Sequence, residues 1–273
     1  MQVTMDRSIR RPVRRARELL GQLRELANVH APPTILPTVL EQLGLVDSYA
    51  SVETPIGPVF VAYNDHGVSA VMRAPSAADF EREFHLRFGR PLRRVARLPA
   101  ALARLVHQQL TGAKCSSPRL DLRRLSEFER AVLLKALEIP RGEVRPYAWV
   151  AREVGFPKAV RAVGSALGRN PVPLFIPCHR VVRSDGSPGE YVFGSEAKRA
   201  VLAAEGIDVE GLEALTRSGT RYFGSDTTRV YCFPTCRNAR RITARHRVPF
   251  MSAEAAAAAG YRPCLVCRPA QAS

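Results

Sequence analysis

The chain has 273 residues, enough for two domains or three small ones, and its 41 lysines and arginines outnumber 25 acidic residues, giving a net charge of +16. Hydrophobic residues make up 46% and charged residues 24%, as in folded globular proteins, which argues against disorder along the whole chain. No run of about 18 apolar residues predicts a membrane span, and the basic start lacks the apolar core of a secretory signal. We therefore expect a cytoplasmic protein.

The first 125 residues predict a leader followed by a small domain. In residues 1–48, a basic run precedes leucines at helical spacing between Leu19 and Leu26, which predicts one short, loosely attached helix. Residues 49–125 predict an α/β domain: the apolar runs 57–63 and 68–72 favour strands joined by a turn at 64–67. Residues 78–89 and 101–112 in the same domain are typical of helices.

Residues 126–212 predict a mostly helical domain. Ser126 and Glu129 have the spacing of a capping box at the start of its first helix. Two short helices follow, at 147–155 and 157–170, and the tight glycine-containing turn between them is typical of a helix-turn-helix. We expect the apolar residues 171–177 to form a buried strand, and residues 211–220 to form a linker.

Arginine supplies nearly all of the positive charge, because the chain has only four lysines. A guanidinium group makes forked contacts with phosphate oxygens, and a pI near 10.5 favours nucleic acid as the partner. The alternative explanation of the charge is an arginine-rich proteome encoded by a GC-rich genome.

Two of the six cysteines stand alone. Cys178 follows the apolar run 171–177 and is followed by His179 and Arg180, whose charge can lower a thiol pKa. The triplet by itself fits either a reactive thiol or a core cysteine. Cys115 has no partner motif and is interpreted as a structural or incidental thiol.

The sequence PKAVRAVGSALGRNPVPLFIPCHRVV, residues 157–182, resembles the active-site signature of the O6-alkylguanine-DNA alkyltransferases. The resemblance is close over residues 126–211 and loose over 50–125. It implies DNA repair by single-turnover transfer of the alkyl group from guanine O6 in double-stranded DNA to a cysteine of the protein. The implied partner is double-stranded DNA containing O6-alkylguanine, bound by a monomer that in a prokaryote is associated with the nucleoid.

The same resemblance implies roles for individual residues. Cys178 matches the acceptor, His179 the histidine that deprotonates it through a water, and Glu205 the carboxylate that orients that histidine. Such a relay activates a nucleophile in the manner of a catalytic triad. Asn170 matches the residue that braces the helix-turn-helix against the active-site loop, and Tyr147 matches the residue that contacts the flipped base and donates a proton to the leaving guanine.

Arg161 matches the arginine that replaces the flipped base in the DNA stack. The helical pattern of residues 157–170 agrees, since Val163 and Leu167 share an apolar face and Arg161, Ser165 and Gly168 fall opposite it. We therefore expect Arg161 and Ser165 to bind DNA, together with Tyr191 from residues 187–194, which match the family's lid loop. That loop departs from the family pattern by its acidic and bulky residues, Glu190, Val192 and Phe193.

The other four cysteines form two pairs, Cys232 with Cys236 and Cys264 with Cys267. Four thiolates at these spacings suit one tetrahedral zinc ion, which would stabilise a module too small for a large core. Residues 218–273 also resemble the zinc domain of the Ada alkylation-response protein, which there precedes the alkyltransferase. That resemblance implies a possible second methyl acceptor, Cys232, for DNA phosphotriesters. A zinc-stapled module that only binds DNA is the alternative.

The expected architecture is an α/β N-terminal domain, a mostly helical catalytic domain with a helix-turn-helix, and a small zinc-stapled α+β C-terminal module. The expected function is repair of O6-alkylguanine, with Zn²⁺ as the one cofactor and Cys232, Cys236, Cys264 and Cys267 as its ligands. The alternative function is a zinc-containing sensor or regulator of DNA alkylation.

Overall fold

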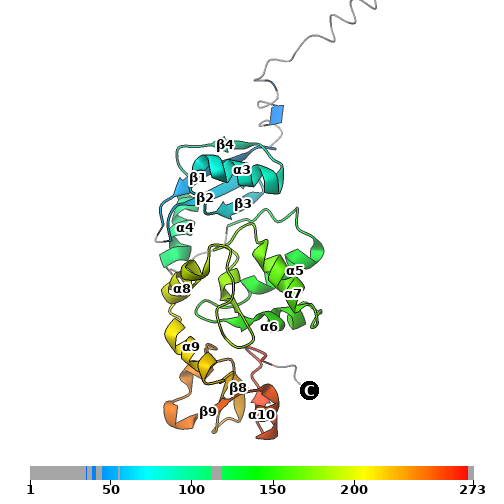
Figure 1. Ribbon diagram of the computed structural model, residues 1–273, viewed down its shortest axis with the longest axis vertical. Coiled ribbons are helices and arrows are strands. Elements are labelled where there is room, and N and C mark those ends of the chain that lie inside the picture. The colour runs from blue at the N-terminus through cyan, green and yellow to red at the C-terminus, as the bar shows by residue number, and fades with distance from the viewer. Residues whose placement is uncertain (1–34, 36–38, 41–44, 55, 112–117, 270–273) are drawn as a thin grey trace, which may run out of the picture. The chain divides into compact units, whose positions relative to one another are not determined.

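The structure is a computed structural model, and it describes residues 35, 39–40, 45–54, 56–111 and 118–269 (Figure 1). The chain divides into two units, residues 1–45 and residues 46–273, and nearly all described residues belong to the second. The predicted leader helix and Cys115 lie outside the described residues. Among the described helices, none is long and apolar enough to cross a membrane.

The second unit begins with a four-stranded sheet in the order β3-β2-β1-β4. The predicted hairpin is confirmed as β2 (Val59–Asn64) and β3 (Gly67–Met72), which pair antiparallel. The sequence reasoning missed β1 (Asp47–Val52), which pairs antiparallel with β2, and the three-residue β4 (Leu92–Arg94), which pairs parallel with β1. The domain thus starts about two residues before the predicted boundary at 49.

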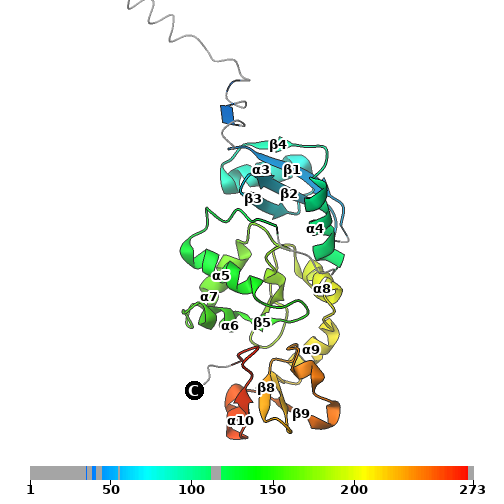
Figure 2. The same cartoon turned by 180° about the vertical axis from the view of Figure 1, so that it is seen from behind.

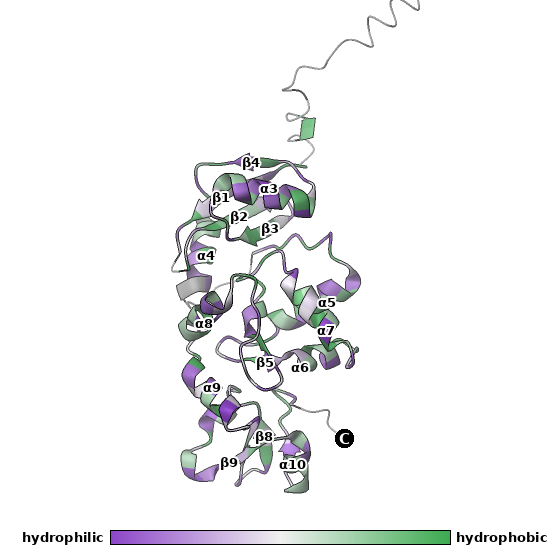
Figure 3. Ribbon diagram, in the orientation of Figure 1, coloured by the Kyte–Doolittle hydropathy of each residue, from purple (hydrophilic) through white to green (hydrophobic). Residues whose placement is uncertain are grey.

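Side chains alternate between the two faces of this sheet along each strand. Each face packs against helices. Tyr49, Phe60 and Met72 pack against Phe80 and Phe84 of α3 (Ala77–Phe88). The neighbouring residues on the strands face a second core shared with α4 (Ala100–Thr111) and the catalytic helices. Figures 1 and 2 show α3 lying on one face of the sheet, and Figure 3 shows hydrophobic residues along β2 and β3.

The helical domain follows as α5 (Glu127–Leu137), α6 (Tyr147–Glu153), α7 (Val160–Gly168) and α8 (Ser195–Ala204). Ser126 and Glu129 form the predicted capping box at the start of α5. The two helices expected to form a helix-turn-helix are α6 and α7, and α7 begins three residues later than expected. A two-stranded parallel sheet joins β5 (Arg145–Pro146) to β6 (Val181–Val182) and brings the start of α6 beside the Cys178 segment.

Two predictions for this domain were wrong. Residues 171–177 are buried, as expected, but they form turns and an isolated bridge rather than a strand. Three prolines in seven residues remove the backbone donors that a strand needs, and Leu174 has a left-handed φ of 75°. Residues 211–220 are not a linker: most of them belong to α9 (Val209–Arg217), which Asp208 caps and which buries Val209 and Leu212.

The C-terminal module is α+β, as predicted. Its sheet has the order β10-β8-β7-β9, formed by β7 (Tyr222–Ser225), β8 (Val230–Cys232), β9 (Arg247–Phe250) and β10 (Arg262–Pro263). The six-residue helix α10 (Ala253–Ala258) begins at the cap Ser252. The small core of the module consists of Tyr231, Phe250, Ala256 and Tyr261. A bound metal ion adds much to the stability of a module with so small a core.

Candidate active site and metal centre

Cys178 opens a short 3-10 helix, Cys178–Arg180, directly after the buried 171–177 turns, and only 6% of its surface is exposed. Asn170, just after α7, holds this segment. Its Nδ2 donates to the carbonyl of Ile176 at 3.0 Å and to Cys178 Sγ at 3.2 Å, and its Oδ1 accepts from the backbone of Val172 at 3.0 Å. These hydrogen bonds tie the residue that follows α7 to the thiol, and bracing of this kind is what the resemblance implies for Asn170.

His179 and Glu205, to which the resemblance assigns the base and the carboxylate that orients it, lie in contact. His179 Nε2 lies 3.0 Å from Glu205 Oε1, both side chains are buried, and His179 Nδ1 has no hydrogen-bond partner among the described residues. Sequence reasoning gave Arg180 only a general positive potential. In the structure its guanidinium makes a forked contact with the Glu205 carboxylate, with Nη2 at 2.7 Å from Oε1 and Nε at 2.9 Å from Oε2.

The protonation states follow from this burial and pairing. Burial lowers the pKa of His179, an effect that Glu205 opposes only in part, and burial raises the pKa of Cys178, an effect that Asn170 opposes. Burial would also raise the pKa of Glu205, but hydrogen bonds from His179 and Arg180 overcome it and bring that pKa to about 2. At neutral pH the site therefore holds a thiol, a neutral imidazole and a carboxylate, so Nδ1 can accept the thiol proton.

A fully buried lysine, which sequence reasoning missed, anchors the loop that follows Cys178. Lys198 on α8 donates to the carbonyls of Val181 at 2.7 Å, Pro188 and Glu190. Burial lowers its pKa to about 8. Two signals in the sequence could have identified it. Lysine is rare in this arginine-rich chain, and position 198 lies two helical turns before Glu205, the residue that follows α8.

The two predicted tyrosines lie near the thiol but in different settings. Tyr147, the first residue of α6, is half-buried, and its pKa is raised by burial and by the proximity of Cys178. Its ring lies against two glycines: a Cβ built on Gly189 would be 3.6 Å from it, and one built on Gly164 of α7 would be 4.0 Å from it. Tyr191, expected to bind DNA, is buried, and its ring meets His179 edge to face with centroids 5.9 Å apart.

The predicted faces of α7 are confirmed. Val163 and Leu167 are buried, whereas Arg161, Ser165 and Gly168 are exposed. In the lid loop, Glu190 extends into solvent with 94% of its side chain exposed, 3.9 Å from Arg183. The carboxylate of the acidic residue that departs from the family pattern is therefore solvated.

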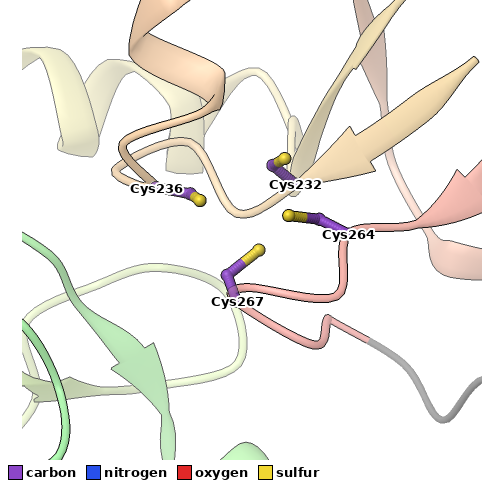
Figure 4. A group of neighbouring side chains, drawn as sticks. All are labelled: Cys232, Cys236, Cys264 and Cys267. Atoms are coloured by element: carbon purple, nitrogen blue, oxygen red, sulfur yellow. The ribbon is translucent and has the colours of Figure 1, made fainter. Parts of the chain in front are cut away.

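The four paired cysteines come together (Figure 4). Their Sγ atoms all lie within 4.8 Å of one another and all four residues are buried. Cys232 ends β8, Cys236 lies in the turn after it, and Cys264 and Cys267 follow β10. A tetrahedral site with Zn–S bonds of about 2.3 Å needs sulfurs roughly 3.8 Å apart, so this donor set fits zinc. Asn238 Nδ2 also lies 3.4 Å from Cys264 Sγ.

Known families match the helical domain and the C-terminal module. Residues 127–207 match the family described as 6-O-methylguanine DNA methyltransferase, DNA binding domain, and residues 216–270 match the metal binding domain of Ada. The structure is similar to the crystal structure of Mycobacterium tuberculosis OGT in complex with DNA, with a TM-score of 0.51 and 28% identity over 61% of this chain and 99% of that one.

Curated relatives agree with these matches. A methylated-DNA–protein-cysteine methyltransferase of Methanosarcina barkeri is 34% identical over 168 residues, which cover 58% of this chain and 96% of the relative. One from Methanothermobacter thermautotrophicus is 45% identical over 92 residues, 34% of this chain and about half (51%) of that protein. The chain thus belongs to the methylated-DNA–protein-cysteine methyltransferases, enzymes of direct-reversal DNA repair, and carries an Ada-type metal-binding domain at its C-terminal end.

Proposed function

We propose that the chain repairs O6-alkylguanine in double-stranded DNA by moving the alkyl group to Cys178. The sulfur attacks the alkyl carbon, so the S–C bond forms as the C–O6 bond breaks. The thiol proton passes through a water to His179 Nδ1, and the guanine leaves with a proton donated by Tyr147. The product is a neutral thioether on Cys178, and each molecule therefore reacts once.

The observation that carries this proposal is the chain of contacts from Asn170 to Cys178 and from His179 to Glu205 and Arg180. Burial raises the pKa of the thiol, so it needs a base at neutral pH. Glu205 accepts from His179 Nε2, which fixes the tautomer in which Nδ1 is the acceptor. Lys198 holds the loop carrying Tyr191 over the same site.

DNA enters on the exposed face of α7. Guanine O6 cannot be attacked within the stack, so the base is extruded towards Cys178, and Arg161 fills the space it leaves. Ser165 and Gly168 on the same face are small enough for close approach of the backbone. We propose that the protein acts as a monomer and that its site of action is the nucleoid of a prokaryotic cell. We also propose three domains, residues 47–125, which include all of β1, residues 126–212 and residues 218–273.

The C-terminal module holds one Zn²⁺ ion through Cys232, Cys236, Cys264 and Cys267. Zinc bound there supplies a tetrahedral cross-link between the β8 turn and the chain after β10. All four sulfurs belong to buried residues, and no difference in exposure favours Cys232 as an acceptor. The burial of the four cysteines therefore does not support methyl transfer to Cys232, and the names of the relatives do not favour a sensor or regulator.

The test is a mass measurement on peptides after incubation with duplex DNA containing O6-methylguanine. Wild type is expected to gain one methyl group on the Cys178 peptide, Cys178→Ala none, and the control Cys115→Ala the same methyl as wild type. A methyl group on any other cysteine of Cys178→Ala would show that the acceptor is assigned to the wrong residue. Adding DNA with methylphosphotriesters to Cys178→Ala tests Cys232 separately.

A further inference from the structure

The segment that carries Tyr147 is held on both sides by the metal-binding module. It runs from Glu143 through β5 and α6 to Glu153, and Tyr147 lies near its middle. The turn at the first cysteine pair of the module contacts the start of this segment, and the chain at the end of the second pair contacts α6.

The turn between Cys232 and Cys236 holds the start of the segment. Thr235 Oγ1 accepts a hydrogen bond from the backbone of Val144 at 3.0 Å. The backbone N–H of Arg237, next to Cys236, donates to Glu143 Oε1 at 3.0 Å. These contacts come from residues adjacent to a metal ligand, so the position of the segment depends on the conformation of that turn.

The chain at Cys267 holds α6. Trp149 Nε1 donates to the carbonyl oxygen of Cys267 at 3.0 Å. One turn further along α6, Arg152 donates to the carbonyl of Pro269 at 3.3 Å, and Glu153 pairs with Arg268 at 2.6 Å. The carbonyl that accepts the Trp149 hydrogen bond thus belongs to Cys267, which is itself one of the four metal ligands.

A buried ion pair fills the space between these two contacts. Glu143 and Arg145 pair with each other and are 1% and 2% exposed. The Arg145 guanidinium lies over the rings of Phe233 at 5.4 Å and Trp149 at 5.8 Å. The four cysteines also belong to the same hydrophobic core as Trp149. Breaking a buried ion pair is strongly destabilising, because it leaves a buried charge without a partner. This pair therefore holds the segment against the module.

We propose that the metal-binding module is a positioning device for methyl transfer: the ion bound by its four cysteines fixes Trp149 and Val144, and through them places Tyr147 over Cys178. Trp149 and Thr235 are positioning residues in this scheme. The proposal rests on the proposed function, in which Tyr147 donates a proton to the leaving base. Losing the metal would slow repair without touching the thiol relay of Cys178, His179 and Glu205.

The first test uses the full chain with and without metal, and needs no activity. Trp149 is the only tryptophan, so its fluorescence reports the bond to Cys267 directly. Metal removal by a chelator should shift its emission, raise amide hydrogen exchange in residues 143–153, and leave exchange in β2 and β3 unchanged. Zinc added back should reverse all three. Unchanged emission and exchange in 143–153 after complete metal loss would overturn the proposal.

The second test asks whether the metal acts through Tyr147. With metal bound, Tyr147→Phe should slow single-turnover methyl transfer by about 100-fold, the low end for a positioned proton donor. In metal-free protein both forms should be slow, and the ratio of their rates should fall below about 3. A purely structural role of the metal would lower both rates and leave the ratio near its value in the metal-bound protein.

Because metal-free protein can unfold more widely, a double variant, Trp149→Phe with Thr235→Val, repeats this comparison with zinc bound. It removes two hydrogen bonds and keeps a ring and a β-branched side chain. Zinc content should stay at one per chain while the Tyr147→Phe ratio falls. Thr243→Val, an exposed threonine of the same module whose side chain makes no capping hydrogen bond, is the control and should keep the full ratio.

The two proposals fail in different ways. If metal-bound wild type puts no methyl on Cys178, the proposed function is wrong. If it does, and the Tyr147→Phe ratio is the same with metal, without metal and in the double variant, repair stands and the positioning role is wrong. If Tyr147→Phe reacts at the wild-type rate with metal bound, Tyr147 is not the group that the module positions, and the proposal is wrong in that form.

Discussion

Replacing Glu205 with glutamine should destabilise the fold and slow methyl transfer together. The substitution keeps the shape of the side chain but removes the charge that pairs with Arg180 and orients His179. Arg180 is then left buried without a counterion, and breaking one side of a buried pair costs about 3–5 kcal/mol.

The pKa of Glu205 gives a second route to the magnitude. It falls from 4.5 to about 2 in the folded protein, and a shift of roughly 2.5 units corresponds to about 3.4 kcal/mol. Because the folded-state pKa is the lower one, this contribution is fully present above the unfolded pKa and is lost as the pH falls towards about 2. The linkage relation gives about 3.4 kcal/mol at pH 7 and about 1.4 kcal/mol at pH 3.

The assay is urea unfolding of wild type and Glu205→Gln at pH 7, 4 and 3. We expect a difference in unfolding free energy of about 3 kcal/mol at pH 7 that shrinks with acid, and a loss of methyl transfer of roughly 100-fold or more, as for a misplaced general base. Glu196→Gln, an exposed site on the same helix, is the control and should cost less than about 1 kcal/mol. A difference below 1 kcal/mol at pH 7, or one that grows in acid, would refute the reasoning.

Two further predictions concern DNA entry and the loop anchor. Arg161→Ala should slow repair of duplex DNA strongly but leave the reaction with a free O6-alkylguanine base within about twofold, because the exposed arginine acts only on stacked DNA; equal losses in both single-turnover assays would instead mean that it supports the fold. Lys198 has its pKa lowered from 10.5 to about 8, so the unfolded chain holds its proton to higher pH. Wild type should therefore gain stability relative to Lys198→Met between about pH 8 and 10.5, by up to about 3.4 kcal/mol; a flat difference between their unfolding free energies across that window would contradict the buried charge.

The sequence alone determined those features whose physics is local or periodic. The capping box at Ser126, the hairpin at 59–72 and the two faces of α7 depend on residues a few positions apart. The paired cysteines predicted a metal site equally clearly, because four thiolates at such close spacing are typical zinc ligands. The resemblance named Cys178, His179, Glu205 and Asn170, and the structure places all four within one set of contacts.

The errors arose where tertiary context outweighs the local pattern. The apolar run 171–177 has the hydrophobicity of a buried strand, but its prolines lack the backbone donors that a strand needs. The run is instead buried as turns that Asn170 holds in place. Residues 211–220 have the composition of a linker, yet Leu212 is buried against the catalytic domain, so the segment folds as α9. The strand β1 was missed because it contains the polar residues Asp47 and Ser48, which are buried and accept hydrogen bonds from other residues of the domain.

The contacts that join distant parts of the chain belong to the tertiary structure alone. The rarity of lysine draws attention to Lys198, but the sequence does not indicate that its ammonium group would meet the carbonyls of residues 181, 188 and 190. Nothing near Trp149 indicates that its N–H would meet the carbonyl of Cys267, more than one hundred positions along the chain. Sequence spacing reports which side chains can act within a few residues of one another, whereas a hydrogen bond between remote segments exists only after packing has brought them together, and it is these bonds that tie the metal-binding module to the helix carrying Tyr147.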